Sequence, residues 1–337
     1  MTSITIAGQT IAADKTAQIH LPAIRLYTDT DISIPIQVIT GKKKGPVVFV
    51  SAAVHGDELN GIEIIRRLNQ HPRLKISAGA LILVPMVNVY GVLNQSRYMP
   101  DRRDLNRCFP GSEKGPLAGR VANIFLNEIV NKSDYGIDLH TGAIHRTNLP
   151  QIRADLDDPE TRNLAEQFGV PVLINSTTRD GSLRQSAVEA GKKILLYEAG
   201  EALRFDELAI AAGVNGVINI LKHLGMTNMR RGKKKITPFV AYNSGWFRAN
   251  ASGIVRSLKN LGDAVEADDV LAEIGGPLGE VLSLVKATRR GIVIGKQNIP
   301  LVQEGDALYH IAYFGKEGDE VAEHIELMQD LYAPEIF

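Results

Sequence analysis

The sequence is poor in the features that mark secreted, membrane-embedded or nucleic-acid-binding proteins. It contains a single cysteine, Cys108, so no disulfide bond can form within the chain and the fold must rest on packing. Its longest apolar runs, at residues 47–54 and 80–87, are far shorter than the ~20 residues that a membrane-spanning helix needs. Basic and acidic residues both number 38, so no net charge favours binding to nucleic acid or to an anionic membrane.

The N-terminal residues 1–18 mix polar side chains with short apolar patches. They lack the apolar core of roughly 7 to 15 residues that a secretion signal contains, and we therefore expect the protein to be cytoplasmic. Hydrophobic residues make up 44% of the chain and charged residues 23%, which is ordinary for a globular protein. At ~150 residues for a typical domain, a chain of 337 residues predicts one large domain or two.

Strand and helix patterns alternate between residues 46 and 224. Residues 47–54 form a valine-rich run too short for a helix, which predicts a buried strand, and apolar residues then recur with helical spacing up to His71. The same patterns predict further strands over 80–87, 135–139, 170–174 and 193–197, and helices over 117–129, 160–168, 182–190 and 206–224. This alternation predicts an α/β fold in which a mostly parallel mixed sheet carries helices on both faces.

The pattern changes after the basic run at residues 229–236, which we interpret as a solvated linker rather than a phosphate-binding patch. Beyond it, residues 252–312 are dense in glycine, valine and turn signals, which predicts short strands joined by tight turns. We therefore expect two domains, residues 1–235 with a β-rich N-terminal part, and a smaller β-rich domain over residues 236–337.

The C-terminal part also carries a weak internal repeat, because Gly253-Ile-Val and Gly291-Ile-Val begin two similar stretches. Paired hairpin units of this kind resemble the small barrel of biotinyl and lipoyl carrier domains. Those carriers present a modifiable lysine at the tip of a hairpin, but the corresponding residues 275–280 contain none. We therefore expect a structural module rather than a carrier.

His55 and Glu58 have the spacing His-x-x-Glu at the point where a predicted strand turns into a helix. Both side chains can therefore reach one divalent metal ion, although the spacing alone arises by chance and also fits a surface loop. His140, in Asp138-Leu-His140, follows another predicted strand. Because α/β sheets bind ligands beyond the carboxyl ends of their strands, we expect His55, Glu58 and His140 to converge.

Two histidines and one glutamate that leave a fourth position for water form a known arrangement for catalytic zinc. A hydrolase of this kind needs a carboxylate that takes a proton from water and gives one to the departing amine. Glu198 directly follows the apolar strand predicted at 193–197 and is our candidate for that role. The alternative for Glu198 is an ordinary surface carboxylate at the end of a strand.

A second polar cluster extends from Arg97 to Gly111, after the strand predicted at 80–87. Asn106 offers an amide donor and Arg107 a planar fork, so together they fit a substrate carboxylate. A further arginine can polarise the carbonyl of the bond that is cleaved. The alternative is a surface loop whose charges pair with each other, Asp101 with Arg102 or Arg103 with Asp104.

The four motifs His55-x-x-Glu58, Asp104-Leu-Asn-Arg107, Asp138-Leu-His140 and Glu198-x-Gly200 together resemble the succinylglutamate desuccinylase/aspartoacylase family, relatives of the zinc carboxypeptidases. The resemblance spans about residues 45–225 in matching order, and the β-rich C-terminal region fits the family architecture. It implies a zinc carboxypeptidase-like fold with one zinc ion per chain.

Carried over residue by residue, the resemblance implies that the zinc ligands are His55, Glu58 and His140 and that Glu198 is the general base and acid. It also implies that Asn106 and Arg107 bind a substrate carboxylate and that Asp104 orients His55. Arg97 would polarise the carbonyl, with Arg102 or Arg103 as the alternative, because the stretch from Arg97 to Asp104 is longer than in the family pattern. His145, Arg146 and Arg153 are expected to line the pocket, and the remaining histidines, including His310, to lie on the surface or in packing positions.

These residues favour a zinc-dependent deacylase that removes the acyl group from a small N-acyl amino acid or N-acyl amine. One alternative is a zinc carboxypeptidase that acts on short peptides, and another is a non-catalytic metal-binding protein. We expect a small-molecule substrate and neither nucleic acid nor a membrane as partner, and a homo-oligomer is compatible with the sequence. We also expect the C-terminal domain to restrict access to the site.

Overall fold

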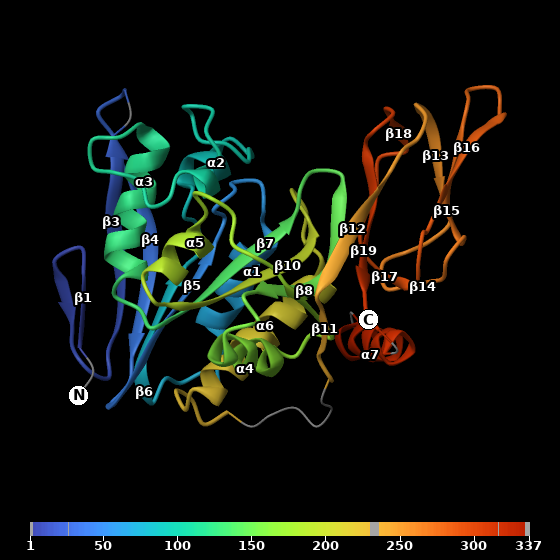
Figure 1. Ribbon diagram of the computed structural model, residues 1–337. Coiled ribbons are helices and arrows are strands. Elements are labelled where there is room, and N and C mark those ends of the chain that lie inside the picture. Colours follow the sequence, from blue (N-terminus) through green and yellow to red (C-terminus); the bar gives the residue numbers. More distant parts are fainter. Residues whose placement is uncertain (1–2, 26, 230–235, 316, 334–337) are drawn as a thin grey trace.

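A computed structural model describes residues 3–25, 27–229, 236–315 and 317–333 of the protein, which is built around one long mixed sheet (Figure 1). Over these residues the sheet contains 13 strands, and its main path is β12-β19-β17-β8-β10-β7-β5-β6-β4-β3. Its strands are β3 (Thr16–Arg25), β4 (Asp31–Thr40), β5 (Lys43–Ala52), β6 (Ala78–Val84), β7 (Tyr135–Gly142), β8 (Arg146–Ala154), β10 (Lys193–Glu201), β12 (Asn243–Arg248), β17 (Gly291–Gln297) and β19 (Ala307–Tyr313), with β9 (Val172–Asn175), β11 (Phe239–Ala241) and β14 (Ala264–Val265) off this path.

The centre of the sheet is parallel, as the alternation of strands and helices predicts. Strands β6, β5, β7 and β10 run in the same direction, and the carboxyl ends of β5, β7 and β10 meet at one edge. Strand β8 pairs antiparallel with β10 on one side and with β17 on the other. The sheet therefore continues from the N-terminal part of the chain into the C-terminal part, while the division into two domains at residue 236 stays a prediction.

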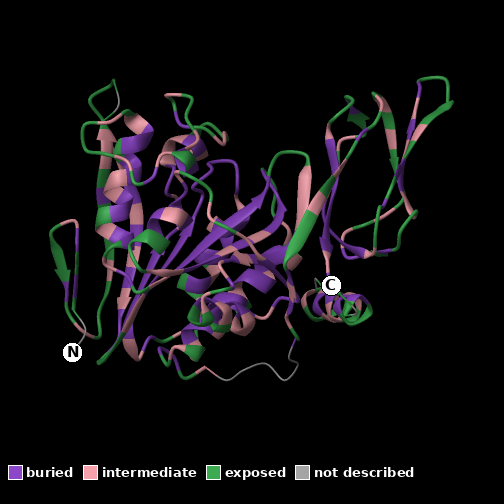
Figure 2. Cartoon of the chain, in the orientation of Figure 1, coloured by how far each residue is buried: buried purple, intermediate pink, exposed green. Residues whose placement is uncertain are grey.

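The central strands are largely buried (Figure 2). Their alternate side chains enter two different hydrophobic cores, one on each face of the sheet. In β5, Val48 and Val50 join the core on one face, and Phe49 joins the core on the other. Such two-sided burial explains why the central strands are continuous apolar runs. Polar side chains in these strands are therefore exceptions, and they mark the site described below.

Helices cover both faces of the sheet, which confirms the predicted α/β fold. One face carries α1 (Asn60–Gln70), α4 (Pro159–Phe168), α6 (Glu207–His223) and α7 (Gly318–Tyr332), and the other carries α3 (Leu117–Phe125), the π-helical turn Leu126–Val130 and α5 (Leu183–Glu189). A short helix α2 (Val89–Leu93) and a 3₁₀ turn (Leu105–Arg107) lie in the loops after β6. None of the helices in the described ranges is long and apolar enough to cross a membrane.

Both ends of the chain are rich in strands. At the N-terminus, β1 (Ile4–Ile6) and β2 (Gln9–Ile11) form a hairpin, and β3 pairs with β4. Near the C-terminus, β13 (Gly253–Ser257), β15 (Val270–Gly275), β16 (Val281–Lys286) and β18 (Leu301–Val302) form a separate four-stranded sheet. Side chains of this sheet pack with those of β17 and β19 in one apolar cluster. Strands β17 and β19 therefore extend the main sheet and also pack against the smaller sheet.

The structure differs from the sequence-based expectations at two elements. Strand β8 was not expected, since Pro150 and several polar residues interrupt its apolar pattern. Helix α7 was also missed, because residues 236–337 were expected to be β-rich. In Gly318–Tyr332, Val321, Ile325 and Met328 recur on one buried helical face. The basic run at residues 230–235 lies outside the described residues.

Gly56 permits the turn that leads from β5 into α1. A methyl group on Gly56 would lie only 1.9 Å from the carbonyl carbon of Gly91, in the backbone of α2. Because that neighbour is backbone rather than a flexible side chain, the segment Ala53–Glu58 approaches α2 closely only with glycine at this position.

We expect Gly56→Ala to lower the free energy of unfolding by about 1–3 kcal/mol, the usual cost of overpacking a tightly packed site. Gly315→Ala is the control, since nothing lies within 4 Å of a methyl group there. Its effect should stay within about 0.5 kcal/mol. Urea denaturation of both variants measures the difference, and equal stabilities would contradict the close approach to α2.

Candidate active site

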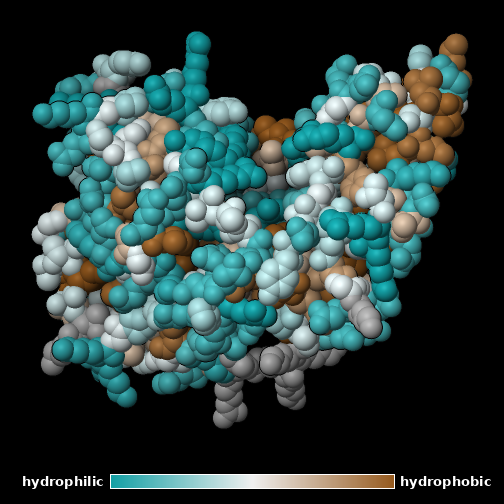
Figure 3. Space-filling view, in the orientation of Figure 1, coloured by the Kyte–Doolittle hydropathy of each residue, from teal (hydrophilic) through white to brown (hydrophobic). Residues whose placement is uncertain are grey.

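A cavity of about 540 Å³ lies where β5, β7 and β10 end and the C-terminal strands approach them. Figure 3 shows the molecule hollowed between its main body and its C-terminal part, with mostly hydrophilic residues around the hollow. The cavity receives residues from both parts of the chain, among them His55, Glu58, Arg97, His140 and Glu198 from the first and Trp246, Arg248 and His310 from the second.

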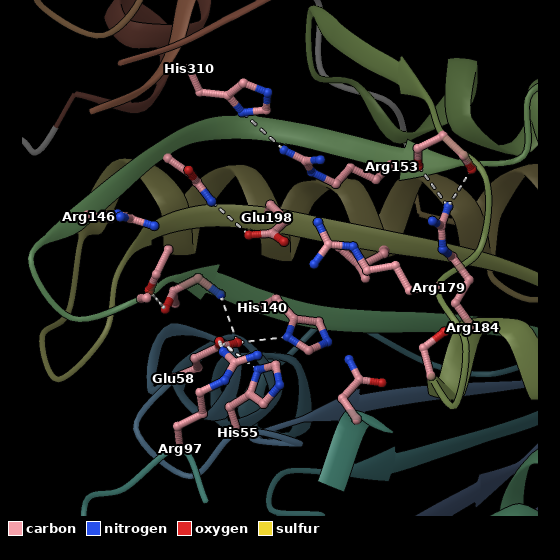
Figure 4. A pocket seen from close by; sticks show the side chains of 18 of the residues that line it. His55, Glu58, Arg97, His140, Arg146, Arg153, Arg179, Arg184, Glu198 and His310 are labelled. Carbon is pink, nitrogen blue, oxygen red and sulfur yellow. Dashed lines mark hydrogen bonds and ion pairs between the residues drawn. The ribbon is translucent and has the colours of Figure 1, made fainter. Parts of the chain in front are cut away.

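At one end of the cavity, His55, Glu58 and His140 form a compact buried group (Figure 4). The Glu58 carboxylate bridges the two histidines: Oε1 lies 2.7 Å from His55 Nδ1, and Oε2 lies 2.7 Å from His140 Nδ1. One ligand atom from each residue lies within 4.8 Å of the others. The structure thus brings together the three residues that the sequence predicted to converge, in a geometry that can hold a metal ion.

The other nitrogen of each histidine faces a second carboxylate. His55 Nε2 lies 3.2 Å from Asp104, and His140 Nε2 lies 2.7 Å from Asp138, which in turn accepts a hydrogen bond from Ser51. Carboxylates behind the histidine ligands are typical of metal sites, because they fix the tautomer and the orientation of the ring. The contact of Asp104 was expected, whereas Asp138 was given no role, although it lies two residues before His140 and so on the same face of β7.

These carboxylates determine the protonation of the group. Burial alone would lower the pKa of His55 and of His140, but the surrounding carboxylates, Glu58 above all for His55 and Asp138 for His140, outweigh it and raise both values. Burial alone would raise the pKa of Glu58, but the two histidines hold it well below its usual range. The same negative field that favours positive charge on the imidazoles favours a metal cation at this point.

Glu198 lies next to this group, on the adjacent strand. It is the direct neighbour of His140 across the parallel pair β10 and β7, so both side chains lie on the same face of the sheet. Its neighbours Tyr197 and Ala199 point into the hydrophobic core on the opposite face. The alternation of β10 therefore directs Glu198 into the cavity, as the sequence predicts.

Asn148 holds the Glu198 carboxylate and was missed in the sequence, since its strand β8 was not expected. Its Nδ2 donates to Glu198 Oε2 over 2.7 Å. The neighbouring residue across the sheet is Gly295, where a methyl group would lie 3.0 Å from Asn148 Oδ1 and 3.1 Å from His310 Cβ. The glycine in β17 therefore leaves the room in which Asn148 reaches Glu198.

Of the three arginines considered for the carbonyl, only Arg97 lines the cavity. Its guanidinium lies 2.9 Å from Asp104 and 3.5 Å from Glu58, at the edge of the His-Glu-His group. Arg102 and Arg103 are exposed, and Arg103 faces Asp101 at 3.8 Å. The position of Arg97 is thus the one compatible with the role that the resemblance implies.

Asn106 and Arg107 follow Asp104 in the 3₁₀ turn and both line the cavity. Asn106 Oδ1 accepts a hydrogen bond of 2.9 Å from the backbone N–H of Leu183, so the amide is oriented and its Nδ2 forms no hydrogen bond within the described residues. Arg107 is exposed and donates to the carbonyl of Asn106. The pair therefore offers an oriented amide donor beside a guanidinium.

The expectation for the residues after His140 holds in part. Arg146 and Arg153 line the cavity, and His145 does not. His310, which was expected on the surface or in packing, is buried in the cavity wall and stacks on Trp246 with ring centroids 4.5 Å apart. No motif marks His310 in the sequence, because only the pairing of β19 with β12 and β17 brings it to the site.

Comparison with known proteins agrees with this geometry. Residues 44–224 match the family model described as the succinylglutamate desuccinylase/aspartoacylase catalytic domain. The chain is 28% identical over 294 residues to an N-alpha-acetyl-L-2,4-diaminobutyric acid deacetylase of Halomonas elongata, covering 83% of this chain and 86% of that protein. It is 29% identical over 186 residues to a succinylglutamate desuccinylase of Burkholderia cenocepacia, covering 49% of this chain and 52% of that protein.

Solved structures show the same fold. The product-bound ectoine utilization protein EutE (DoeB) of Ruegeria pomeroyi has a TM-score of 0.79 at 23% identity, covering 90% of this chain and 97% of that chain. A succinylglutamate desuccinylase/aspartoacylase of Rhodobacter sphaeroides has a TM-score of 0.78 at 24% identity, covering 90% and 98%.

The geometry predicts that the purified protein binds about one divalent metal ion per chain and that His140→Ala loses most of it, because only two of three ligands remain. His145→Asn is the matched control, since His145 is exposed and asparagine tolerates its positive φ of 65°. Elemental analysis of both variants measures the metal content. Equal metal content in His140→Ala and the parent would show that His140 is not a ligand.

Proposed function

Because the chain belongs to the succinylglutamate desuccinylase/aspartoacylase family, whose relatives named above are deacylases, we propose that it is a zinc-dependent hydrolase that cleaves the amide bond of a small N-acyl amino acid or N-acyl amine. The observation that carries this proposal is the buried His55-Glu58-His140 group with Glu198 beside it on the next strand. Two nitrogens and a carboxylate are a donor set suited to zinc. The single cysteine fits the cytoplasmic location expected from the sequence.

His55, Glu58 and His140 would hold the zinc ion, which would supply a Lewis acid for polarising a carbonyl and acidifying water. Glu198 accepts the proton of the attacking water and donates it to the departing amine, so that the amine leaves neutral. Asn148 holds one oxygen of Glu198 and leaves the other available for this transfer. Asp104 and Asp138 keep both imidazoles oriented with Nδ1 toward Glu58.

The arginines and Asn106 bind and polarise the substrate. Arg97, held by Asp104 beside Glu58, stabilises the negative charge that develops on the carbonyl oxygen. Asn106 and Arg107 bind the carboxylate of the amino acid, because an amide donor and a planar fork together match its two oxygens. In this proposal the substrate is held at a point remote from the bond that is cleaved.

The C-terminal strands support a small substrate over a peptide. Trp246 and Arg248 of β12 and Ala307 and His310 of β19 close one side of the cavity. A carboxypeptidase that accepts extended chains needs an open groove, whereas these residues wall this cavity on one side. A non-catalytic metal-binding protein would not need Glu198, Arg97 and Arg107 around the same cavity.

We expect Glu198→Gln to keep its metal and to lose activity by a factor of about 10² to 10⁴, the usual contribution of a general acid and base. Glu189→Gln, on the exposed end of α5, is the control and should retain full activity. Steady-state kinetics with acetyl, succinyl and formyl derivatives of amino acids, together with metal analysis, test this. A loss of less than tenfold on the best substrate would reject the role of Glu198.

Arg107→Lys keeps the charge but removes the planar fork. We expect kcat/KM to fall about tenfold to a hundredfold, which is the effect of losing one hydrogen bond to a charged group. The loss should be smaller on an analogue whose α-carboxylate is replaced by an amide. Arg103→Lys, an exposed residue of the same loop, is the control. Equal losses on both compounds would mean that Arg107 supports the loop rather than the substrate.

A further inference from the structure

A short turn at residues 143–145 joins β7 to β8 beside the candidate metal group. Residues on both sides of this turn line the cavity, among them His140, Arg146 and Asn148. His140 is a candidate metal ligand, and Asn148 donates the hydrogen bond that holds Glu198. The position of the turn therefore affects how the metal group and the carboxylate that transfers the proton lie relative to each other.

The pairing of β10 with its two neighbours is interrupted next to this turn. Strand β10 shifts register directly after Glu198 on both sides, before Gly200 against β8 and before Glu201 against β7. Gly200 has a φ of 74°, which a regular strand does not contain. Irregularities of this kind occur next to active sites, where they re-aim a side chain. Hydrogen bonds from side chains can hold the neighbouring turn at such a point.

Glu201 supplies hydrogen bonds of this kind, three residues after Glu198. Its side chain is buried, and its Oε1 accepts a hydrogen bond of 2.9 Å from the backbone N–H of His145. Its Oε2 accepts a hydrogen bond of 2.8 Å from Asn298 Nδ2. The backbone N–H of Asn298 in turn donates to the carbonyl of His145 over 2.7 Å. We call Glu201 and Asn298 together the clasp.

The clasp holds the backbone of His145 from both sides. His145 has a φ of 65°, a left-handed conformation that residues with a side chain rarely adopt. Glu201 binds its N–H group and Asn298 binds its carbonyl, so both polar groups of this residue are fixed. Glu201 is the last residue of β10, whereas Asn298 lies in the loop between β17 and β18. The turn is thus held between the central sheet and the C-terminal part of the chain.

We propose that Glu201 and Asn298 are positioning residues for the catalytic carboxylate. By fixing the turn after β7, they keep Asn148 in place, and Asn148 in turn holds Glu198 where it transfers the proton. Neither residue of the clasp is among those that line the cavity, so they act through the backbone of the turn and not on the substrate. This inference rests on the proposed function.

The clasp should affect kcat more than KM. Asn148 lies three residues after His145 on the segment that the clasp holds. Asn106 and Arg107, which bind the substrate carboxylate in the proposed function, lie on the loop after β6 and are not bonded to the clasp. A displacement of the turn therefore alters the hold on Glu198 while the substrate is still bound.

An exchange of hydrogen-bonding roles tests the clasp. Asn298→Asp places a second carboxylate against Glu201 at an exposed position, and adding Glu201→Gln restores the hydrogen bond with donor and acceptor exchanged. We expect Asn298→Asp to lower kcat about tenfold to a hundredfold, as is usual for residues that support a site from behind, and to change KM less than about threefold. The double variant should recover most of the loss. An unchanged kcat in Asn298→Asp, or no recovery in the double variant, would overturn the proposal.

A cycle with Asn148→Ala distinguishes positioning from a general loss of structure. If the clasp acts through Asn148, Asn298→Asp should lower kcat less than about twofold in the Asn148→Ala background, because the contact that it protects is already absent. Independent, additive losses would contradict this route. Arg204→Gln is the control, since Arg204 lies 3.4 Å from Glu201 but its side chain is 65% exposed. Its kcat should stay within about twofold of the parent.

Hydrogen exchange separates this inference from the proposed function. If the parent hydrolyses none of the acetyl, succinyl and formyl amino acids, the deacylase proposal fails, but the clasp can still be tested in the intact protein. We expect the backbone amides of residues 143–148 to exchange faster in Asn298→Asp, at the parent rate in the double variant, and at the parent rate in Arg204→Gln. Unchanged exchange in Asn298→Asp would overturn the clasp. Faster exchange with an unchanged kcat in an active enzyme would overturn its role in positioning Glu198.

Discussion

The candidate site depends on one buried carboxylate, that of Glu58, which bridges His55 and His140. A carboxylate in the protein interior is costly unless charged or hydrogen-bonding partners surround it. Here the partners are the imidazoles of His55 and His140, the backbone N–H of Thr141 and the guanidinium of Arg97. The partners come from strand β7 and from the loops after β5 and β6. These three segments must therefore be in place together, which couples the fold to the site.

The sheet that holds this group also explains how the cavity is closed. Strand β8 turns back antiparallel beside β10 and then pairs with β17, which brings the C-terminal strands to the same edge. Asn148, Gly295 and His310 follow one another across β8, β17 and β19, so residues about 150 positions apart shape one wall. The C-terminal part is therefore a component of the cavity, and it contributes Trp246 and His310 to its wall.

Much of the site could be predicted because strand alternation and motif order are local properties. The runs around β5, β7 and β10 indicate buried strands, and the polar residue at the end of each is conspicuous in an apolar context, as with His140 and Glu198. Strand β8 escaped prediction because its polar residues face the cavity and Pro150 interrupts the pattern. Asn148 and His310 were missed because their roles follow from the pairing of β8, β17 and β19, which no local pattern in the sequence indicates.

The sequence by itself determined the α/β class, the family and the three residues that converge as metal-ligand candidates, because periodicity, strand ends and spacing are written in neighbouring residues. Only the tertiary structure decided which arginine reaches the group, which residue holds Glu198, and which residues hold the turn after β7. The sequence alone does not distinguish Arg97 from Arg102 and Arg103, but in the structure only Arg97 of the three lines the cavity. The physical reason is that compensation of charge depends on distance and burial, and the chain sets both only after its distant strands have paired.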